Sequence, residues 1–173
     1  IYLNGGTLNA RNTLIAGNAA PTSPDVAGAL TSLGHNLIGN NDGASFGSTF
    51  DVDAPRLDQL GDTASPLDPD FDPLGLQANG AGPNVPKTLG LLAYSPAINT
   101  GDNAVTQAGS ALLTNLGISR LVYDERGKGF GRKVLTTVDI GAFEFQMNLN
   151  KFYKFKSSRT TSTTLSVAPS EGL

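Results

Sequence analysis

The feature that most constrains the fold is a weak internal repeat near the start of the sequence. NTLIAGN at residues 12–18 superposes on HNLIGNN at residues 35–41 with an offset of 23 residues, which matches the Leu-Ile pair at 14–15 to the one at 37–38. Short apolar runs cut by Gly and Asn at such a period predict coils of a β-solenoid, since one coil buries its apolar face only by stacking on another. The alternative is a pair of hairpins with similar turns.

The composition also favours short strands and many turns. The chain has 173 residues, enough for one domain with a core, and contains 21 Gly and 10 Pro. It has no cysteine, which excludes disulfides and thiolate metal sites. It has no apolar run of 18 residues and no basic stripe with interleaved aromatics, so we expect no membrane span in this chain and no nucleic-acid partner.

We expect four segments along the chain. They are solenoid coils (1–45), an Asp/Pro-rich surface excursion with a return strand (46–102), a loop or short helix with closing strands (103–145), and a basic aromatic cap segment with a Ser/Thr-rich tail (146–173). Helical spacing of Ala and Leu occurs at residues 103–118, but Gly109 and Gly117 weaken it, so a long loop is the alternative. Residues 119–125 and 133–145 predict two strands around a Gly-rich turn.

The run TTVDIGAFEF at residues 136–145 places two carboxylates among apolar residues. In a strand, Asp139 and Glu144 leave opposite faces because their spacing is odd, although a bulge at Gly141 would alter this. The odd spacing disfavours a cooperating acid–base pair. The lone His35 has no Ser or acid at a recognised spacing and gives no triad. The sequence therefore predicts no catalytic residues.

Three blocks follow one another in an order typical of a known family. They are NTLIAGN…DVAGALTSLGHNLIGNNDG, DPDFDPLGLQANGAGPN…LGLLAYSPAINTGD and DERGKGFGR…VDIGAFEF. This set, over roughly residues 10–145, resembles the choice-of-anchor Q type domain, which closes the C-terminal end of right-handed parallel β-helix proteins on bacterial surfaces. The resemblance implies an all-β fold of C-terminal β-helix coils with a long surface loop and a capping strand segment. It also implies an extracellular or cell-surface location.

The chain departs from the family pattern in three places. Asn99 stands where the family usually has Asp, Lys87-Thr88-Leu89-Gly90 replaces a run that commonly ends in His, and no sortase-type signal follows the domain. The chain opens IYLNGG, without Met or a signal peptide, and we expect a piece of a longer or processed protein.

The resemblance also implies a structural clamp, because DERG and VDIGAFE occur together in the family. Its residues are Asp124, Arg126, Asp139 and Glu144. In this clamp Asp139 accepts hydrogen bonds from backbone N–H groups or from Arg126 and holds the preceding turn on the last coil.

The spacing of Asp68, Asp70 and Asp72 resembles the start of a calcium loop. Pro73 occupies the sixth position, where Gly is usual, and no acid stands at the twelfth. A solvated turn is the favoured interpretation, and calcium is the one cofactor that the sequence suggests.

The charge is distributed unevenly along the chain. Residues 1–110 carry 10 acids and 3 bases, a net −7, whereas residues 111–173 carry 5 acids and 9 bases, a net +4. This is either a surface drift or a basic end that meets an acidic partner, such as another copy. The candidate interface lies in the tail and consists of Lys151, Phe152, Tyr153, Lys154, Phe155, Lys156 and Arg159. These residues either cover the open end of the solenoid or pair with another molecule by strand addition.

The favoured function is a non-enzymatic structural module that closes and presents an extracellular β-helix at a bacterial cell surface, as an adhesin-like or anchoring part. Its partners would be the rest of a longer β-helix polypeptide or neighbouring surface proteins. Two alternatives stay open: a subunit of a self-assembling surface structure that uses the basic tail, and the C-terminal part of a polysaccharide-active enzyme with its catalysis upstream.

Overall fold

The computed structural model describes residues 1–45, 47–79, 85–114 and 116–147. Its elements are seven short strands, one 3₁₀ helix and one short α-helix. They are β1 (Asn9–Ala10), β2 (Leu14–Ile15), β3 (Thr31–Ser32), β4 (Leu37–Ile38), β5 (Gln59–Leu60), β6 (Phe71–Ala78), β7 (Lys87–Leu91), η1 (Asn103–Thr106) and α1 (Ala111–Thr114).

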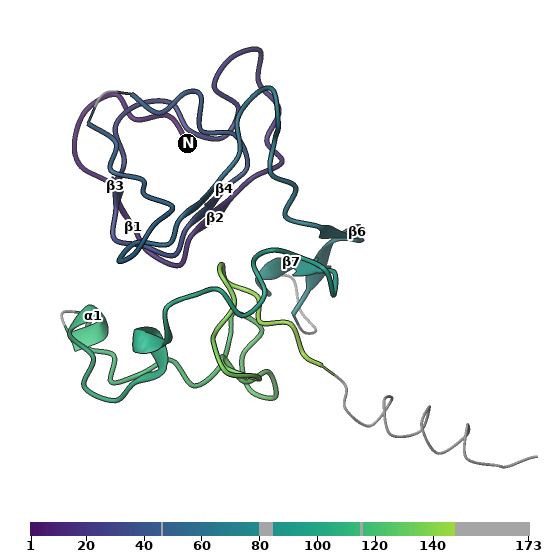
Figure 1. Ribbon diagram of the computed structural model, residues 1–173. Coiled ribbons are helices and arrows are strands. Elements are labelled where there is room, and N and C mark those ends of the chain that lie inside the picture. The colour runs from purple at the N-terminus through teal and green to yellow at the C-terminus, as the bar shows by residue number, and fades with distance from the viewer. Residues whose placement is uncertain (46, 80–84, 115, 148–173) are drawn as a thin grey trace, which may run out of the picture.

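The first five strands form two small parallel sheets. β1 pairs with β3, and β2, β4 and β5 form a three-stranded sheet in that order. The register places Leu14 opposite Leu37 and Ile15 opposite Ile38, so the predicted pairing of the two repeats is confirmed. Figure 1 shows this part of the chain folding back over itself, with β1 beside β3 and β2 beside β4.

The predicted right-handed parallel β-helix is wrong. The described residues contain small separate sheets, none of them closed or extended as a solenoid, and little helix. The Leu-Ile motif occurs in only two strands and is already replaced by Gln59-Leu60 in β5, which lies in the segment predicted as a surface excursion. After β5 the Asp/Pro-rich sequence leads into an antiparallel pair, β6 with β7, which has a register shift between Phe71 and Leu76. The periodic signal was therefore too short to specify a continuous solenoid.

Two apolar clusters lie on opposite faces of the β2–β4–β5 sheet. Because successive strand residues point to opposite faces, Ile15 and Ile38 enter a cluster with Ala10, Val26 and Leu30. Leu37 enters the other cluster, whose further buried members are Leu91, Ala97 and Ile140. Full burial of each such aliphatic side chain contributes about 1.5–3 kcal/mol. The second cluster fixes the C-terminal loops on the outer face of the sheet (Figure 1).

A buried polar side chain, that of Asn36, connects the chain segments that carry the two parallel sheets. Asn36 is fully buried; its Oδ1 accepts from the backbone N–H of Thr13 at 3.0 Å, and its Nδ2 donates to the carbonyl of Ala10 at 3.1 Å. Its Nδ2 also donates to Asp58 Oδ1 at 2.9 Å, which reaches the next layer. Burying an amide is favourable here because its polar atoms find partners.

The C-terminal loops differ from the predicted strands. Residues 119–125 and 133–145 form no strand, and only an isolated antiparallel bridge joins Tyr123 to Gly131. The candidate helix at 103–118 is reduced to η1 and α1, with Gly109 between them at a φ of +72°. That value lies in the left-handed region, which interrupts a right-handed helix.

The sequence predicts a core of Leu14, Ile15, Leu37, Ile38, Ile140, Phe143 and Phe145, and this prediction is confirmed in part. Ile15, Leu37, Ile38 and Ile140 are buried, but Leu14, Phe143 and Phe145 are only half-buried. None of the helices in the described parts of the chain has the length and apolar character that crossing a membrane requires.

Candidate functional site

The most unusual feature of the described chain is a cluster of charged side chains inside the C-terminal loops. We call it the arginine–carboxylate cluster, and its members are Asp124, Arg126, Arg132, Asp139 and Glu144. Asp139 is only 2% exposed and Glu144 only 1%. Such burial requires that each charge be paired and hydrogen-bonded, because an isolated buried charge costs several kcal/mol.

Glu144 and Arg132 form the centre of the cluster. Glu144 Oε2 accepts from Arg132 Nη1 at 2.6 Å and from the backbone N–H of Asp139 at 2.9 Å. Its Oε1 accepts from the backbone N–H of Val134 at 3.1 Å. Arg132 Nη2 donates to the carbonyls of Asp139 and Gly141, at 3.1 and 2.9 Å. The pair therefore holds the loop backbone on several sides.

Asp139 joins two chain segments that are distant in sequence. Its Oδ1 accepts from the backbone N–H of Asn99 at 2.8 Å, and its Oδ2 accepts from that of Phe145 at 2.6 Å. The carboxylate thereby connects the segment after β7 to the end of the described chain.

Asp124 and Arg126 form a second ion pair at the edge of the cluster. Arg126 Nε donates to both oxygens of Asp124, at 3.2 and 3.0 Å, and its Nη2 donates to the carbonyl of Glu144. The guanidinium lies between the rings of Phe130 and Phe143, at 4.1 and 3.8 Å from their centroids. Stacking between two rings gives Arg126 a cation–π contribution beyond its ion pair.

Burial changes the acidity of two members. Desolvation raises the pKa of Asp139 above its usual value, although hydrogen bonds from Phe145 and Asn99 and the charge of Arg132 oppose the change. Desolvation likewise raises the pKa of Glu144, where the neighbouring charge of Asp139 adds to the effect and Arg132 opposes it. With all groups ionised, three carboxylates face two guanidinium groups, so protonation of one acid would leave the cluster neutral.

The structure brings all four residues of the predicted clamp together. Of the two kinds of partner predicted for Asp139, the structure shows the backbone N–H groups, whereas Arg126 binds Asp124. Sequence reasoning missed Arg132, which it placed in a hairpin turn. The signal was nevertheless present, because two acids in an apolar run need a buried cation, and Arg suits that role better than Lys.

The prediction that Asp139 and Glu144 point to opposite faces is wrong, because residues 136–145 form no strand. Gly141 has a φ of +101° and turns the chain between them. Both side chains consequently point inward, but no hydrogen bond joins their carboxyl oxygens. Each carboxylate is instead surrounded by donors.

The cluster is attached to the parallel sheets through β2 and the residues just before it. The backbone N–H of Gly141 donates to the carbonyl of Asn12 at 2.9 Å. The side chain of Asn12 donates to the backbone carbonyl of Asp102 at 3.0 Å and accepts from the backbone N–H of Asp102 at 2.6 Å. Arg11 forms an ion pair with Asp102 at 2.6 Å.

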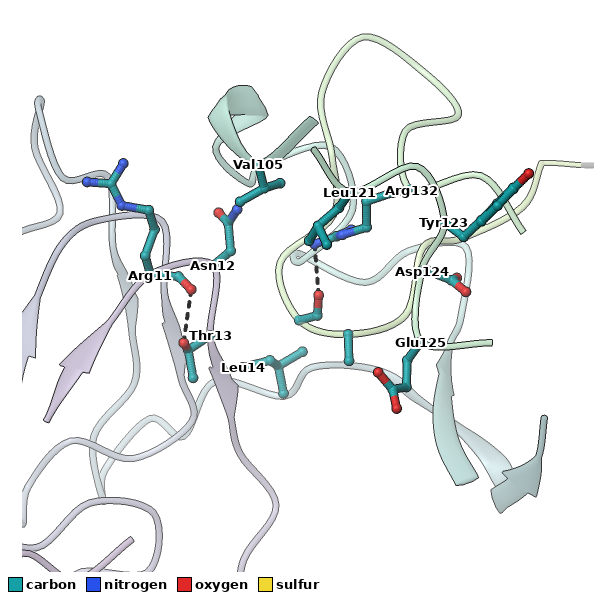
Figure 2. A pocket seen from close by; sticks show the side chains of 12 residues that line it. Arg11, Asn12, Thr13, Leu14, Val105, Leu121, Tyr123, Asp124, Glu125 and Arg132 are labelled. Carbon is teal, nitrogen blue, oxygen red and sulfur yellow. Dashed lines mark hydrogen bonds between the residues drawn. The ribbon is translucent and has the colours of Figure 1, made fainter. Parts of the chain in front are cut away.

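A groove of about 620 Å³ runs along this junction. Figure 2 shows Asn12 and Leu14 on one side and Leu121 and Arg132 across from them. Exposed Glu125 also lines the groove, whereas the carboxylate of Asp124, another lining residue, is used by Arg126 and by the backbone N–H of Glu144. The groove thus borders the cluster, and the carboxylates of the cluster are engaged with protein donors.

Two of the three candidate calcium residues, Asp68 and Asp72, use their carboxylates in turns. Asp68 Oδ1 accepts from the backbone N–H of Asp70 at 2.8 Å, and Asp72 Oδ1 accepts from that of Leu74 at 2.9 Å. Within the described ranges, no group of three or more His, Cys, Asp and Glu side chains is arranged to hold a metal ion.

The residues of the candidate tail interface, Lys151–Lys156 and Arg159, lie outside the described residues. His35, at a positive φ of 56°, has its Nδ1 2.8 Å from the carbonyl of Thr100, which is a structural contact between the parallel sheets and the later chain.

No protein family matches the sequence, and comparisons with curated proteins and with solved structures likewise find no match.

Proposed function

We propose that this chain is a non-enzymatic structural module whose arginine–carboxylate cluster locks the C-terminal loops onto the parallel sheets. The observation that carries the proposal is that all three carboxylates of the arginine–carboxylate cluster are fully used by protein donors. Both oxygens of Asp124, of Asp139 and of Glu144 accept hydrogen bonds from protein donors. A general acid or base must instead reach a proton on a substrate.

The connections of the cluster support the same role. The donors to Asp139 and Glu144 come from residues 99, 132, 134, 139 and 145, so the two carboxylates gather several stretches of irregular backbone. Loops without sheet partners need such acceptors, because a buried N–H without a partner costs about 1–3 kcal/mol. The cluster replaces the hydrogen bonds that strands would have supplied.

The proposal includes an extracellular setting at a bacterial cell surface, where the module would be joined to a longer polypeptide or to neighbouring surface proteins. The support for this setting is the ordered set of sequence blocks that resembles the choice-of-anchor Q type domain. Protease treatment of intact source cells tests the location, since a surface module should be cleaved while a cytoplasmic marker remains.

The test of the structural role is the change Glu144→Gln, with Glu125→Gln as the matched control. The first change removes the charge that compensates Arg132 and places an amide donor among donors, so we expect a loss of about 3–5 kcal/mol in the free energy of unfolding. Glu125 is exposed, and its replacement should change the free energy by less than about 0.5 kcal/mol.

Urea unfolding followed by circular dichroism measures both variants. Residues kept for catalysis often cost stability, and their replacement tends to leave the free energy of unfolding unchanged or raise it. A Glu144→Gln variant as stable as the unmodified chain would therefore contradict the structural role.

A further inference from the structure

A second concavity lies between the β6–β7 pair and the C-terminal loops (Figure 1). We call it the aromatic pocket. Residues between 72 and 91 form one of its walls, and residues between 126 and 146 form the other. The parallel sheets take no part in it, because its lining begins at residue 72. Its volume of about 380 Å³ lies within the range of small-molecule sites, about 300–1,000 Å³.

Three phenylalanines line the aromatic pocket, and the fold uses them differently. Phe130 and Phe143 hold the guanidinium of Arg126 between their rings, and Phe143 also packs against the apolar cluster that contains Ile140. Among the described residues, Phe145 belongs to neither apolar cluster and to neither cation–π contact. Its half-buried ring is therefore an apolar surface of the pocket that the core does not use.

Polar atoms without a partner accompany these rings. Asn79 Oδ1 accepts from Thr88 Oγ1 at 2.9 Å, whereas the buried Asn79 Nδ2 finds no partner in the described chain. Asp72 Oδ1 accepts from the backbone N–H of Leu74, and no described residue donates to its Oδ2. Gln146 spends its Nε2 on two backbone carbonyls, and no described residue donates to its Oε1. The pocket lining therefore combines an unused donor with unused acceptors.

The amide of Asn79 is the most informative of these groups. Thr88 fixes one end of the amide, so turning the amide over would only exchange which of its two atoms lacks a partner. A buried polar group without a partner destabilises the fold, because its hydrogen bonds to water are lost and not replaced. A hydroxyl of a bound molecule would supply the missing partner.

The charges around the aromatic pocket disfavour ionic ligands. Asp72 and the arginine–carboxylate cluster, in which three carboxylates face two guanidinium groups, repel an anion. A cation would compete with Arg126, which already occupies the ring faces of Phe130 and Phe143. A neutral molecule with apolar faces and many hydroxyls avoids both conflicts.

We propose that the aromatic pocket is a binding site for a neutral saccharide. The C–H face of a pyranose ring packs on Phe145, and its hydroxyls, which both donate and accept, pair with Asn79, Asp72 and Gln146. This binding goes beyond the structural role proposed above and does not rest on it. The structural role is measured as stability in urea, whereas the pocket is measured as affinity for a sugar.

The test is an NMR titration of the complete, ¹⁵N-labelled chain with three neutral disaccharides, cellobiose, lactose and maltose, in the millimolar range. We expect at least one of them to shift the side-chain NH₂ signals of Asn79 and the backbone signal of Phe145, with saturation. The Phe145→Leu variant should weaken this binding about 3–10-fold, because it keeps an apolar side chain but removes the ring. Phe145→Tyr keeps the ring and should retain the affinity.

A second variant tests the polar half of the site. Asn79→Asp keeps an acceptor for Thr88 and removes the donor, so the affinity should fall about 3–10-fold. The matched control is Phe50→Leu, since Phe50 packs against the other apolar cluster and does not line the pocket. It should leave the dissociation constant unchanged.

Four results would overturn the proposal. They are the absence of shifts with all three disaccharides, shifts confined to residues outside the pocket, an unchanged dissociation constant in both Phe145→Leu and Asn79→Asp, and preference for a charged analogue. The last is measured with cellobiouronic acid and chitosan disaccharide, which resemble cellobiose in ring skeleton but carry a carboxylate or ammonium groups. Tighter binding of either than of cellobiose would contradict the neutral class.

Discussion

Replacing Arg132 with Met tests how the arginine–carboxylate cluster stabilises the fold. Methionine retains much of the aliphatic stem but removes the guanidinium that donates to Glu144 and to the carbonyls of Asp139 and Gly141. Glu144, only 1% exposed, then becomes a buried acid without its counterion.

The expected loss has two parts with different pH dependence. The uncompensated carboxylate accounts for most of the lost stability, since removing one partner of a buried ion pair costs about 3–5 kcal/mol at neutral pH. The two carbonyls that lose Arg132 contribute a part that does not titrate, about 1–3 kcal/mol for a buried group left unpaired. For a chain of this length, each kcal/mol corresponds to about 2–4 °C in the midpoint of thermal unfolding.

The sign of the pH effect follows from the acidity of Glu144. Its pKa is already raised by burial and should rise further without Arg132. An acid whose folded-state pKa is raised favours the folded state below its unfolded pKa, and this contribution is lost as pH rises through the folded pKa. The deficit of Arg132→Met should therefore shrink on acidification. The decrease is about 1.4 kcal/mol for each unit by which the folded-state pKa of Glu144 in the variant exceeds that in the unmodified chain.

Urea unfolding at pH 7.5 and at pH 4.5, followed by circular dichroism, measures this deficit. Arg120→Met serves as the control, because Arg120 is exposed and its loss should change the free energy of unfolding by less than about 0.5 kcal/mol. A deficit below about 1 kcal/mol at pH 7.5, or one of equal size at both pH values, would refute the electrostatic role assigned to Arg132.

Two further predictions concern a glycine in close contact with a neighbouring chain segment and the pKa values of the two buried acids Asp139 and Glu144. Gly43→Ala should cost about 3 kcal/mol in urea unfolding, because a Cβ there would lie 1.8 Å from the carbonyl oxygen of Val26, whereas Gly131→Ala, with its nearest atom at 3.9 Å, should be nearly neutral. Carbon-detected NMR titration should give pKa values above the ordinary ones for Asp139 and Glu144, whose contribution to stability is lost as pH rises through them. Ordinary values would contradict the burial argument.

The sequence predicted local pairing better than it predicted the global fold. The match of the Leu-Ile pairs was enough to specify the register of β2 on β4, because a shift by one residue would exchange the faces of Leu37 and Ile38. The same two copies could not specify how many layers follow. That number depends on residues such as Gln59 and Leu60, which form β5 and pair with β4 although they do not repeat the Leu-Ile motif.

Four of the five members of the arginine–carboxylate cluster were predictable from the sequence, but Arg132 and the geometry of the cluster were not. Asp124, Arg126, Asp139 and Glu144 were grouped from their sequence blocks, and the structure places them within one cluster. The opposite orientation predicted for Asp139 and Glu144 failed because it treated the segment 133–145 as a strand. The rule that odd and even residues point to opposite faces holds only in a regular strand. Residues 133–145 pair with no strand in the described part of the chain.

Gly141 explains why two acids occur in this apolar run. At a φ of +101° it turns the backbone between Asp139 and Glu144, and a Cβ there would lie 3.3 Å from that of Leu14. The turned backbone presents N–H groups inward, where no strand can receive them, and the two carboxylates receive them instead. The acids are therefore a consequence of the irregular loop, and Arg132 is required because those acids bring negative charge into a buried place.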